Sequence, residues 1–162
     1  MAKRTISVSS LLKSKTDDLA RQRKSVQNLR AHSGALAQAL ALTNAVQRLA
    51  DSTWANPIAY DWSETLVELN VVCRIKVDSL KGAKMIEILE AAEAIPGLDA
   101  KGTRDWATAS WAEREFIYRG NPYGVNVMLK IEAELPIDGE ACKRVQTGVK
   151  LEEVPQYEIV CE

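Results

Sequence analysis

A strict alternation of apolar and polar residues over positions 64–78 constrains the fold of this chain more than any other feature. One side of the repeat is Thr65, Val67, Leu69, Val71, Cys73, Ile75 and Val77, and the other is Glu68, Asn70, Arg74, Lys76 and Asp78. A period of two is that of a β-strand with one buried and one solvated face, which is typical of antiparallel sheets. We therefore expect a long, half-buried strand here.

The residues that follow predict a small sheet covered by one helix. Asp78-Ser79 can cap a helix over 80–95, which Pro96-Gly97 would end, and 98–103 would form a loop. Extended segments are expected at 106–119, 125–135, 141–150 and 156–161, with turns at 120–124 and 136–139. The first two of these segments, 106–119 and 125–135, would form a hairpin.

Residues 9–50 read as helix, because they contain no proline, one glycine and many strong helix formers. Ser9 or Ser10 could cap its start. Leucine and valine recur at heptad spacing, at Leu12, Leu19, Val26, Leu29 and Leu36, while Lys15, Gln22 and Ser33 interrupt the repeat. This imperfect pattern favours a short coiled coil or a helix packed on a domain. The segment 31–34 could bend the helix or split it in two, and the part after Gly34 is expected to be the docked half.

Together these segments predict an α+β fold: a long N-terminal helix or helical hairpin, then a β-α-β-β-β two-layer sandwich with a mostly antiparallel sheet. The charge is divided along the same line. Residues 1–50 carry nine Lys and Arg against two Asp and Glu, whereas residues 51–162 carry twelve against twenty. We expect a basic helical arm over 1–53 and an acidic α+β domain over 54–162.

The cysteines and the single histidine exclude several common chemistries. Cys73, Cys142 and Cys161 form no C-x-x-C pair, and His32 alone cannot complete a recognisable zinc-finger set. No dinucleotide-binding, P-loop or metalloprotease motif is present. We expect binding rather than catalysis, with no cofactor and no metal. Three half-buried thiols are the expected state, with a Cys142–Cys161 bridge as the alternative.

The chain has no apolar run of the ~18 residues that a membrane span needs, and its first residues lack the apolar core of a signal peptide. A soluble, cytoplasmic protein that contacts no membrane is therefore expected. The imperfect heptads and the free edges of a small sheet also favour a homo-oligomer.

All nine aromatic residues follow position 53, some of them beside arginines, and they suggest a binding surface. The candidates are Tyr118, Arg119, Asn121 and Tyr123 around the hairpin, with Arg74 and Arg114 nearby. Such residues are enriched where proteins bind partners, and arginine beside an aromatic ring could hold a small anionic ligand. The alternative is that the tryptophans, Trp62 and Trp111 above all, fill the core.

A second candidate surface is the basic arm, through Lys13, Lys15, Arg21, Arg23, Lys24 and Arg30. These cations could contact nucleic acid. The arm lacks the aromatic residues that often accompany them, so the cations could equally be a solvated face or a complement to the acidic domain.

The C-terminal third carries Trp-Ala-Thr-Ala-Ser-Trp at 106–111, Ala-Cys-Lys-Arg-Val-Gln-Thr-Gly-Val-Lys at 141–150 and Pro-Gln-Tyr-Glu-Ile-Val-Cys at 155–161. This pattern resembles small uncharacterised accessory proteins of tailed bacteriophages and prophages. The resemblance implies a protein that acts in the host cytoplasm by inhibiting a host or defence factor or by sequestering a small ligand. It implies no catalytic residues. A role in virion assembly is a further alternative.

Overall fold

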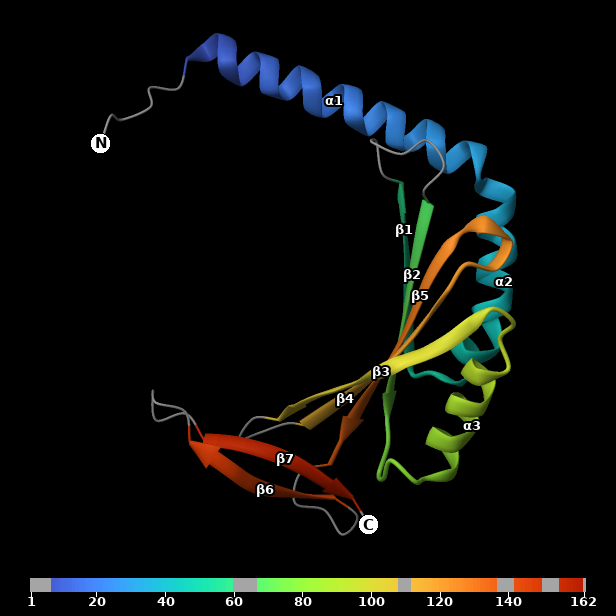
Figure 1. Ribbon diagram of the computed structural model, residues 1–162, viewed down its shortest axis with the longest axis vertical. Coiled ribbons are helices and arrows are strands. Elements are labelled where there is room, and N and C mark those ends of the chain that lie inside the picture. Colours follow the sequence, from blue (N-terminus) through green and yellow to red (C-terminus); the bar gives the residue numbers. More distant parts are fainter. Residues whose placement is uncertain (1–6, 60–66, 108–111, 137–141, 150–154, 162) are drawn as a thin grey trace.

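The computed structural model describes residues 7–59, 67–107, 112–136, 142–149 and 155–161, the last two ranges by their backbone alone. The elements are α1 (Val8–Ala31), α2 (Ser33–Leu49), β1 (Ser52–Ala59), β2 (Val67–Lys76), α3 (Ala83–Glu93), β3 (Leu98–Ala107), β4 (Ala112–Gly120), the short 3-10 turn η1 (Pro122–Gly124), β5 (Asn126–Leu135), β6 (Cys142–Val149) and β7 (Pro155–Cys161). The predicted α+β class is confirmed (Figure 1).

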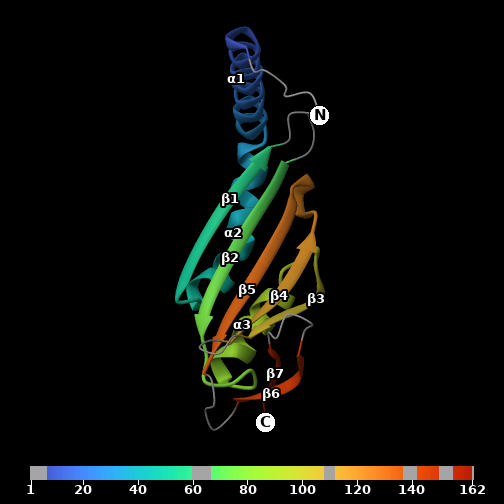
Figure 2. The same cartoon turned by 90° about the vertical axis from the view of Figure 1, so that its left-hand side faces the viewer.

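Five strands form one sheet in the order β1-β2-β5-β4-β3, which Figure 2 shows almost face on. Three of the four strand pairs are antiparallel, as expected. The central pair is parallel, with Glu68 opposite Asn126 and Arg74 opposite Glu132. The alternation along β2 predicted a half-buried strand but not this parallel neighbour. β6 and β7 pair as a separate two-stranded sheet, whose register sets Cys142 opposite Cys161.

Helices α2 and α3 cover one face of the five-stranded sheet, and the core lies between the two layers (Figure 1). The inner side of β2 is the predicted one, including Leu69, Cys73 and Ile75. Leu36 and Val46 of α2 belong to the same core, so the part of the helical segment after Gly34 is docked, as expected. We call the side of the sheet that α2 and α3 do not cover the open face.

The helical segment is two helices that meet at His32, whose backbone leaves the helical region (φ −103°, ψ 12°). Its ring Nδ1 lies 2.9 Å from the Asn28 carbonyl oxygen and covers the end of α1. α1 begins earlier than predicted, because the Ser7 hydroxyl accepts the Ser10 N–H and caps the first turn. In Figure 1, α1 leads away from the end of α2 and does not fold back on it. No residue of α1 is buried.

Two segments expected to be irregular are strands. Residues 52–57, at the predicted boundary between the arm and the domain, belong to β1, and the loop expected at 98–103 is the start of β3. Both are edge strands that expose most of their residues on either side. Pro57 fits β1 because an edge strand needs no N–H on its outer side. α3 is shorter than the predicted helix and is capped by Gly82, not by Asp78-Ser79.

β3 begins directly against the end of β4. Leu98 is the register partner of Gly120, and the preceding Gly97 has the left-handed conformation (φ 79°) that glycine adopts without strain. A Cβ on Gly120 would overlap the Gly97 carbonyl oxygen. The two glycines therefore allow the backbones to approach closely where the α3–β3 connection meets β4.

Candidate functional site

Two rows of charged side chains cross the open face. In one row Arg74 of β2 lies beside Glu132 of β5, which lies beside Glu115 of β4. In the next row, Lys76 lies beside Glu134, followed by Glu113. Since residues paired directly across a sheet project to the same side, the strand order brings four glutamates and two cations together.

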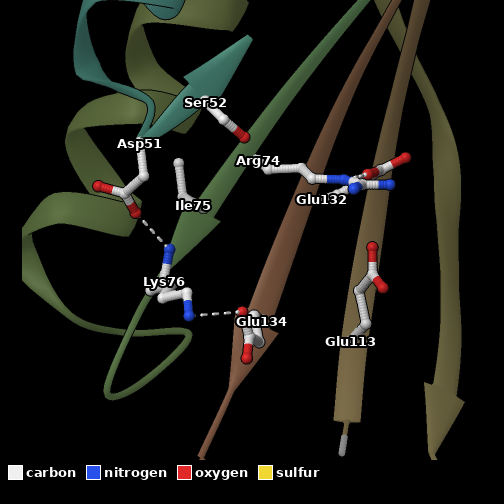
Figure 3. A pocket seen from close by; sticks show the side chains of 8 residues that line it. All are labelled: Asp51, Ser52, Arg74, Ile75, Lys76, Glu113, Glu132 and Glu134. Carbon is white, nitrogen blue, oxygen red and sulfur yellow. Dashed lines mark hydrogen bonds and ion pairs between the residues drawn. The ribbon is translucent and has the colours of Figure 1, made fainter.

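A hollow of about 460 Å³ lies over this part of the open face (Figure 3). It is lined by Asp51, Ser52, Arg74, Ile75, Lys76, Glu113, Glu132 and Glu134. The lining therefore carries four carboxylates against two cations. β1, β2, β4 and β5 and the turn before β1 all contribute to it.

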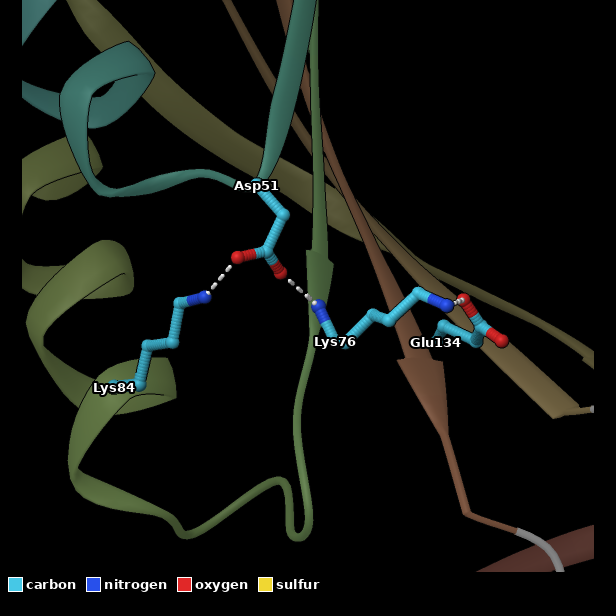
Figure 4. Close-up of polar contacts among 4 residues, drawn as sticks. All are labelled: Asp51, Lys76, Lys84 and Glu134. Atoms are coloured by element: carbon cyan, nitrogen blue, oxygen red, sulfur yellow. Dashed lines mark hydrogen bonds and ion pairs between the residues drawn. The ribbon is translucent and has the colours of Figure 1, made fainter.

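Both cations of the hollow are already paired. The Arg74 guanidinium donates to Glu132, which raises the pKa of Arg74, and Lys76 Nζ lies 3.3 Å from the Glu134 carboxylate. Asp51 joins the hollow to α3, because its two oxygens accept from Lys84 Nζ at 2.5 Å and from the Lys76 N–H at 2.6 Å (Figure 4). These two hydrogen bonds lower the pKa of Asp51.

Glu113 is the exception in the hollow. Within the described ranges its carboxyl makes no hydrogen bond or ion pair, although it faces the same space as Arg74 and Glu132 (Figure 3). Burial, followed by the nearby charge of Glu132, raises the pKa of Glu113. A partly desolvated carboxylate among other carboxylates favours a proton or a cationic donor.

Beside the hollow, Glu115 is 2% exposed and forms an ion pair with Lys130, whose Nζ lies 2.5 Å from Glu115 Oε1. Its second oxygen has no hydrogen-bond partner in the described part of the chain. Glu115 depends on this ion pair, because a buried carboxylate without a cationic partner would be costly.

The structure spreads the sequence-predicted hairpin residues over both faces of the sheet. Arg74 lines the hollow, whereas Arg119 lies farther along the open face, 3.5 Å from the Met128 sulfur, and lines a smaller hollow of about 280 Å³. Arg114 lies on the helix side and donates to both oxygens of Asp105, at 2.6 and 2.5 Å.

The remaining hairpin candidates form no common pocket. Tyr118 is buried in the core, which raises the pKa of its hydroxyl. Asn121 and Tyr123 are exposed at the turn, where Tyr123 has a left-handed backbone (φ 55°). Of the tryptophans, Trp54 and Trp106 are about half exposed on the two edge strands, on the side of the open face. Tyr60, Trp62 and Trp111 lie outside the described residues.

All six predicted cations of the arm, Lys13, Lys15, Arg21, Arg23, Lys24 and Arg30, are exposed on α1. Arg21 pairs with Asp18 at 2.5 Å one turn away. The six cations thus lie on the exposed surface of α1.

Glu113, Glu132 and Glu134 were not among the predicted site residues. The signal was present, since each lies on the polar side of a segment expected to be a strand. What the sequence did not reveal is that β2 and β5 are neighbours, and only that pairing sets Arg74 and Lys76 beside the two glutamates of β5.

Few groups in the described ranges have the environment of a nucleophile or a metal ligand. Burial raises the pKa of Cys73 to about 11, so that its thiol is protonated at neutral pH. No group of three or more His, Cys, Asp or Glu side chains among these residues is placed to hold a metal ion. Within the same part of the chain, no helix has the length and apolar character needed to cross a bilayer.

No protein-family model matches the sequence. A search of curated proteins likewise finds no match. The open face and α1 are therefore the candidate functional surfaces.

Proposed function

We propose that this chain is a non-enzymatic, homo-oligomeric binding protein that holds its partner on the open face, at the hollow around Glu113. Its mechanism would be occupancy: the preformed surface binds a partner and nothing is turned over. The observation that carries this proposal is the carboxyl of Glu113, which has no hydrogen-bond or ion-pair partner among the described residues, in a hollow where the other charged side chains are paired.

The lining favours a cationic group of the partner over the small anionic ligand that the arginines suggested. Four carboxylates face two cations, and both cations are already bound to carboxylates. An amine or guanidinium entering between Glu113 and Glu134 would gain a charge-assisted hydrogen bond, whereas an anion would have to displace Glu132 from Arg74. A partner protein with an exposed lysine or arginine fits this surface best.

The resemblance to phage accessory proteins supports a host protein, such as a defence factor, as that partner. The protonated thiol of Cys73 supports binding rather than covalent catalysis, because the thiolate is the reactive form of cysteine.

A tri-arginine peptide amide tests the hollow directly. In two-dimensional amide NMR spectra, we expect saturable shifts at residues 74–76, 113 and 132–134 as the peptide is added. Glu113→Gln should weaken this binding by about tenfold or more, because a hydrogen bond to a charged group is replaced by a neutral one. Glu87→Gln, at an exposed site on α3, is the matched control and should leave the affinity unchanged. Absence of saturable shifts, or equal affinity in both variants, would refute the proposed site.

A second candidate function is nucleic-acid binding through α1, favoured by the six exposed cations on a helix with only two acidic residues. Fluorescence anisotropy with a labelled duplex would test it. This function requires an affinity that falls steeply with salt, and it requires Lys24→Gln and Arg30→Gln to reduce that salt dependence. Salt-independent or undetectable binding would exclude it.

A further inference from the structure

α1 carries an apolar stripe that the proposed hollow does not use. Its large exposed apolar residues are Val8, Leu11, Leu12, Leu19 and Val26, each between 46% and 73% exposed. Leu12, Leu19 and Val26 are seven residues apart, so they fall along one side of the helix with a drift of only about 20° per heptad. A stripe of this length on a helix with no buried residue has an unused capacity for burial.

The stripe lies about a quarter turn away from the contact between α1 and its own sheet. α1 touches the sheet near its C-terminal end, where the Ser25 hydroxyl donates to the Ala59 carbonyl oxygen at 3.0 Å. Successive helical residues are turned by about 100°, so Val26 and the residues in line with it face elsewhere. Figure 1 shows the N-terminal part of α1 projecting beyond the sheet.

We infer that this stripe binds α1 of a second copy of the chain, as an antiparallel pair of helices. The inference deepens the proposed function, since it rests on the chain being a homo-oligomer and assigns the surface that assembles it. A helix of 24 residues offers about three heptads, enough for a short coiled coil. The heptad spacing matches the repeat of a helix that packs against another of its own kind.

We call the positions of α1 that would face the second copy the seam, and its polar residues select the antiparallel orientation. Leu12, Leu19 and Val26 occupy one seam position of the heptad, and Val8, Lys15, Gln22 and Leu29 occupy the other. Parallel helices would set Lys15 against Lys15 of the second copy. Antiparallel helices set Leu19 against Gln22 and Val26 against Lys15, so that each polar residue meets an apolar one. Lysine tolerates this because its stem packs while its ammonium reaches water. In this orientation Leu12 lies beside Leu29, which already packs partly against the core of its own chain.

The charges along α1 favour the same orientation. Its first half, residues 8–19, has two lysines and two aspartates, whereas residues 20–31 have four cations and no acid. Parallel pairing would bring the two basic halves together, while antiparallel pairing places each beside a neutral half. Asp18 and Arg23 could pair between parallel helices, but exposed pairs contribute little and Asp18 is already bound to Arg21.

Sedimentation equilibrium of the full chain tests the interface. We expect a dimer that dissociates on dilution and a Leu19→Asn variant whose dimer is weaker by about 100-fold or more, because each dimer loses two buried leucines. Ala20→Asn is the matched control: it introduces the same residue one position along, off the seam, and should leave dimerisation unchanged. Lys15→Leu should tighten the dimer by about tenfold or more. A monomeric wild type, or equal effects of the two asparagine variants, would overturn the inference.

Orientation is measured separately, with a spin label on Ser9→Cys in a Cys142→Ser/Cys161→Ser background. Antiparallel helices separate the two labels by about 35 Å along the axis, whereas parallel helices leave them side by side. Short distances would refute the antiparallel arrangement. The peptide titration of the hollow, repeated on Leu19→Asn, keeps the two proposals distinguishable. If this variant is monomeric and still binds the peptide, the result does not count against the hollow. It counts against the helix pair only if the wild type is also monomeric.

Discussion

Gly120→Ala is expected to destabilise the protein strongly, although it adds a single methyl group. The new Cβ would overlap the Gly97 carbonyl oxygen and lie 2.7 Å from the Gly97 carbonyl carbon and 3.0 Å from the Leu98 Cα. All three are backbone atoms, so no side chain can rotate to make room. The start of β3 must move away from β4 instead.

The size of the effect follows from what that movement disrupts. Overpacking costs about 1–3 kcal/mol. Displacing Leu98, which is 7% exposed and pairs with Gly120, loses part of the roughly 1.5–3 kcal/mol that a buried leucine contributes. We expect a total of about 3 kcal/mol, which for a chain of this size lowers Tm by about 6–12 °C.

Urea unfolding followed by circular dichroism at fixed protein concentration measures this loss. The midpoint should fall while the slope of the transition is unchanged. Gly34→Ala is the control, because a Cβ there has nothing within 4 Å and alanine is the better helix former. That variant should be neutral or up to about 1 kcal/mol more stable. If Gly120→Ala unfolds within about 0.5 kcal/mol of the wild type, the reasoning about this close approach is wrong.

Three further predictions concern buried and charged groups. The raised pKa of Glu113 means that the folded state keeps this proton to higher pH than the unfolded state, in which the pKa has its ordinary value of 4.5. The stability of the fold therefore falls as the pH rises from 4.5 through the raised pKa. Glu113→Gln should stabilise the protein at pH 7 and lose this advantage near pH 4, as measured by urea midpoints. Lys130→Met leaves Glu115 buried without its cation and should cost about 3–5 kcal/mol, most of it recovered in Lys130→Met/Glu115→Leu; equal stability of the single and double variants would contradict this. With Cys142→Ser and Cys161→Ser in place, Cys73 should react with a thiol reagent at the rate of unfolding, and rapid labelling of the folded protein would show that its thiol is accessible.

The sequence was most informative where one side of an element is buried. Leu69 and Ile75 on β2, and Ile88 on α3, lie on the predicted inner sides because burial imposes a period on the residues that share a face. β1 and β3 escaped detection for the same reason. Nearly all their residues are exposed on both sides, so their pairing depends on backbone hydrogen bonds that select no particular side chains.

The candidate site was harder to predict than the fold, because it depends on which strands are neighbours. Arg74 was a candidate, yet the residue that pairs with it, Glu132, lies 58 positions away along the chain. Tyr118 and Arg119 looked equivalent in the sequence, but adjacent residues of a strand project to opposite sides. One is therefore buried in the core and the other exposed on the open face.

The parallel pairing of β2 with β5 also has a consequence for how the chain reaches its native state. β1 and β2 can associate as soon as they are made, and β3, β4 and β5 follow one another with short connections. The pairing of β2 with β5 can form only after both strands have been synthesised, because the paired residues Arg74 and Glu132 are 58 positions apart. At translation rates of about 5–20 residues per second, β2 emerges several seconds before β5. During that interval its inner edge has no neighbour, and closing the long loop is the step expected to limit the folding rate. Substitutions along the β2–β5 pairing should therefore affect yield and aggregation during synthesis more readily than they affect the stability of the folded protein.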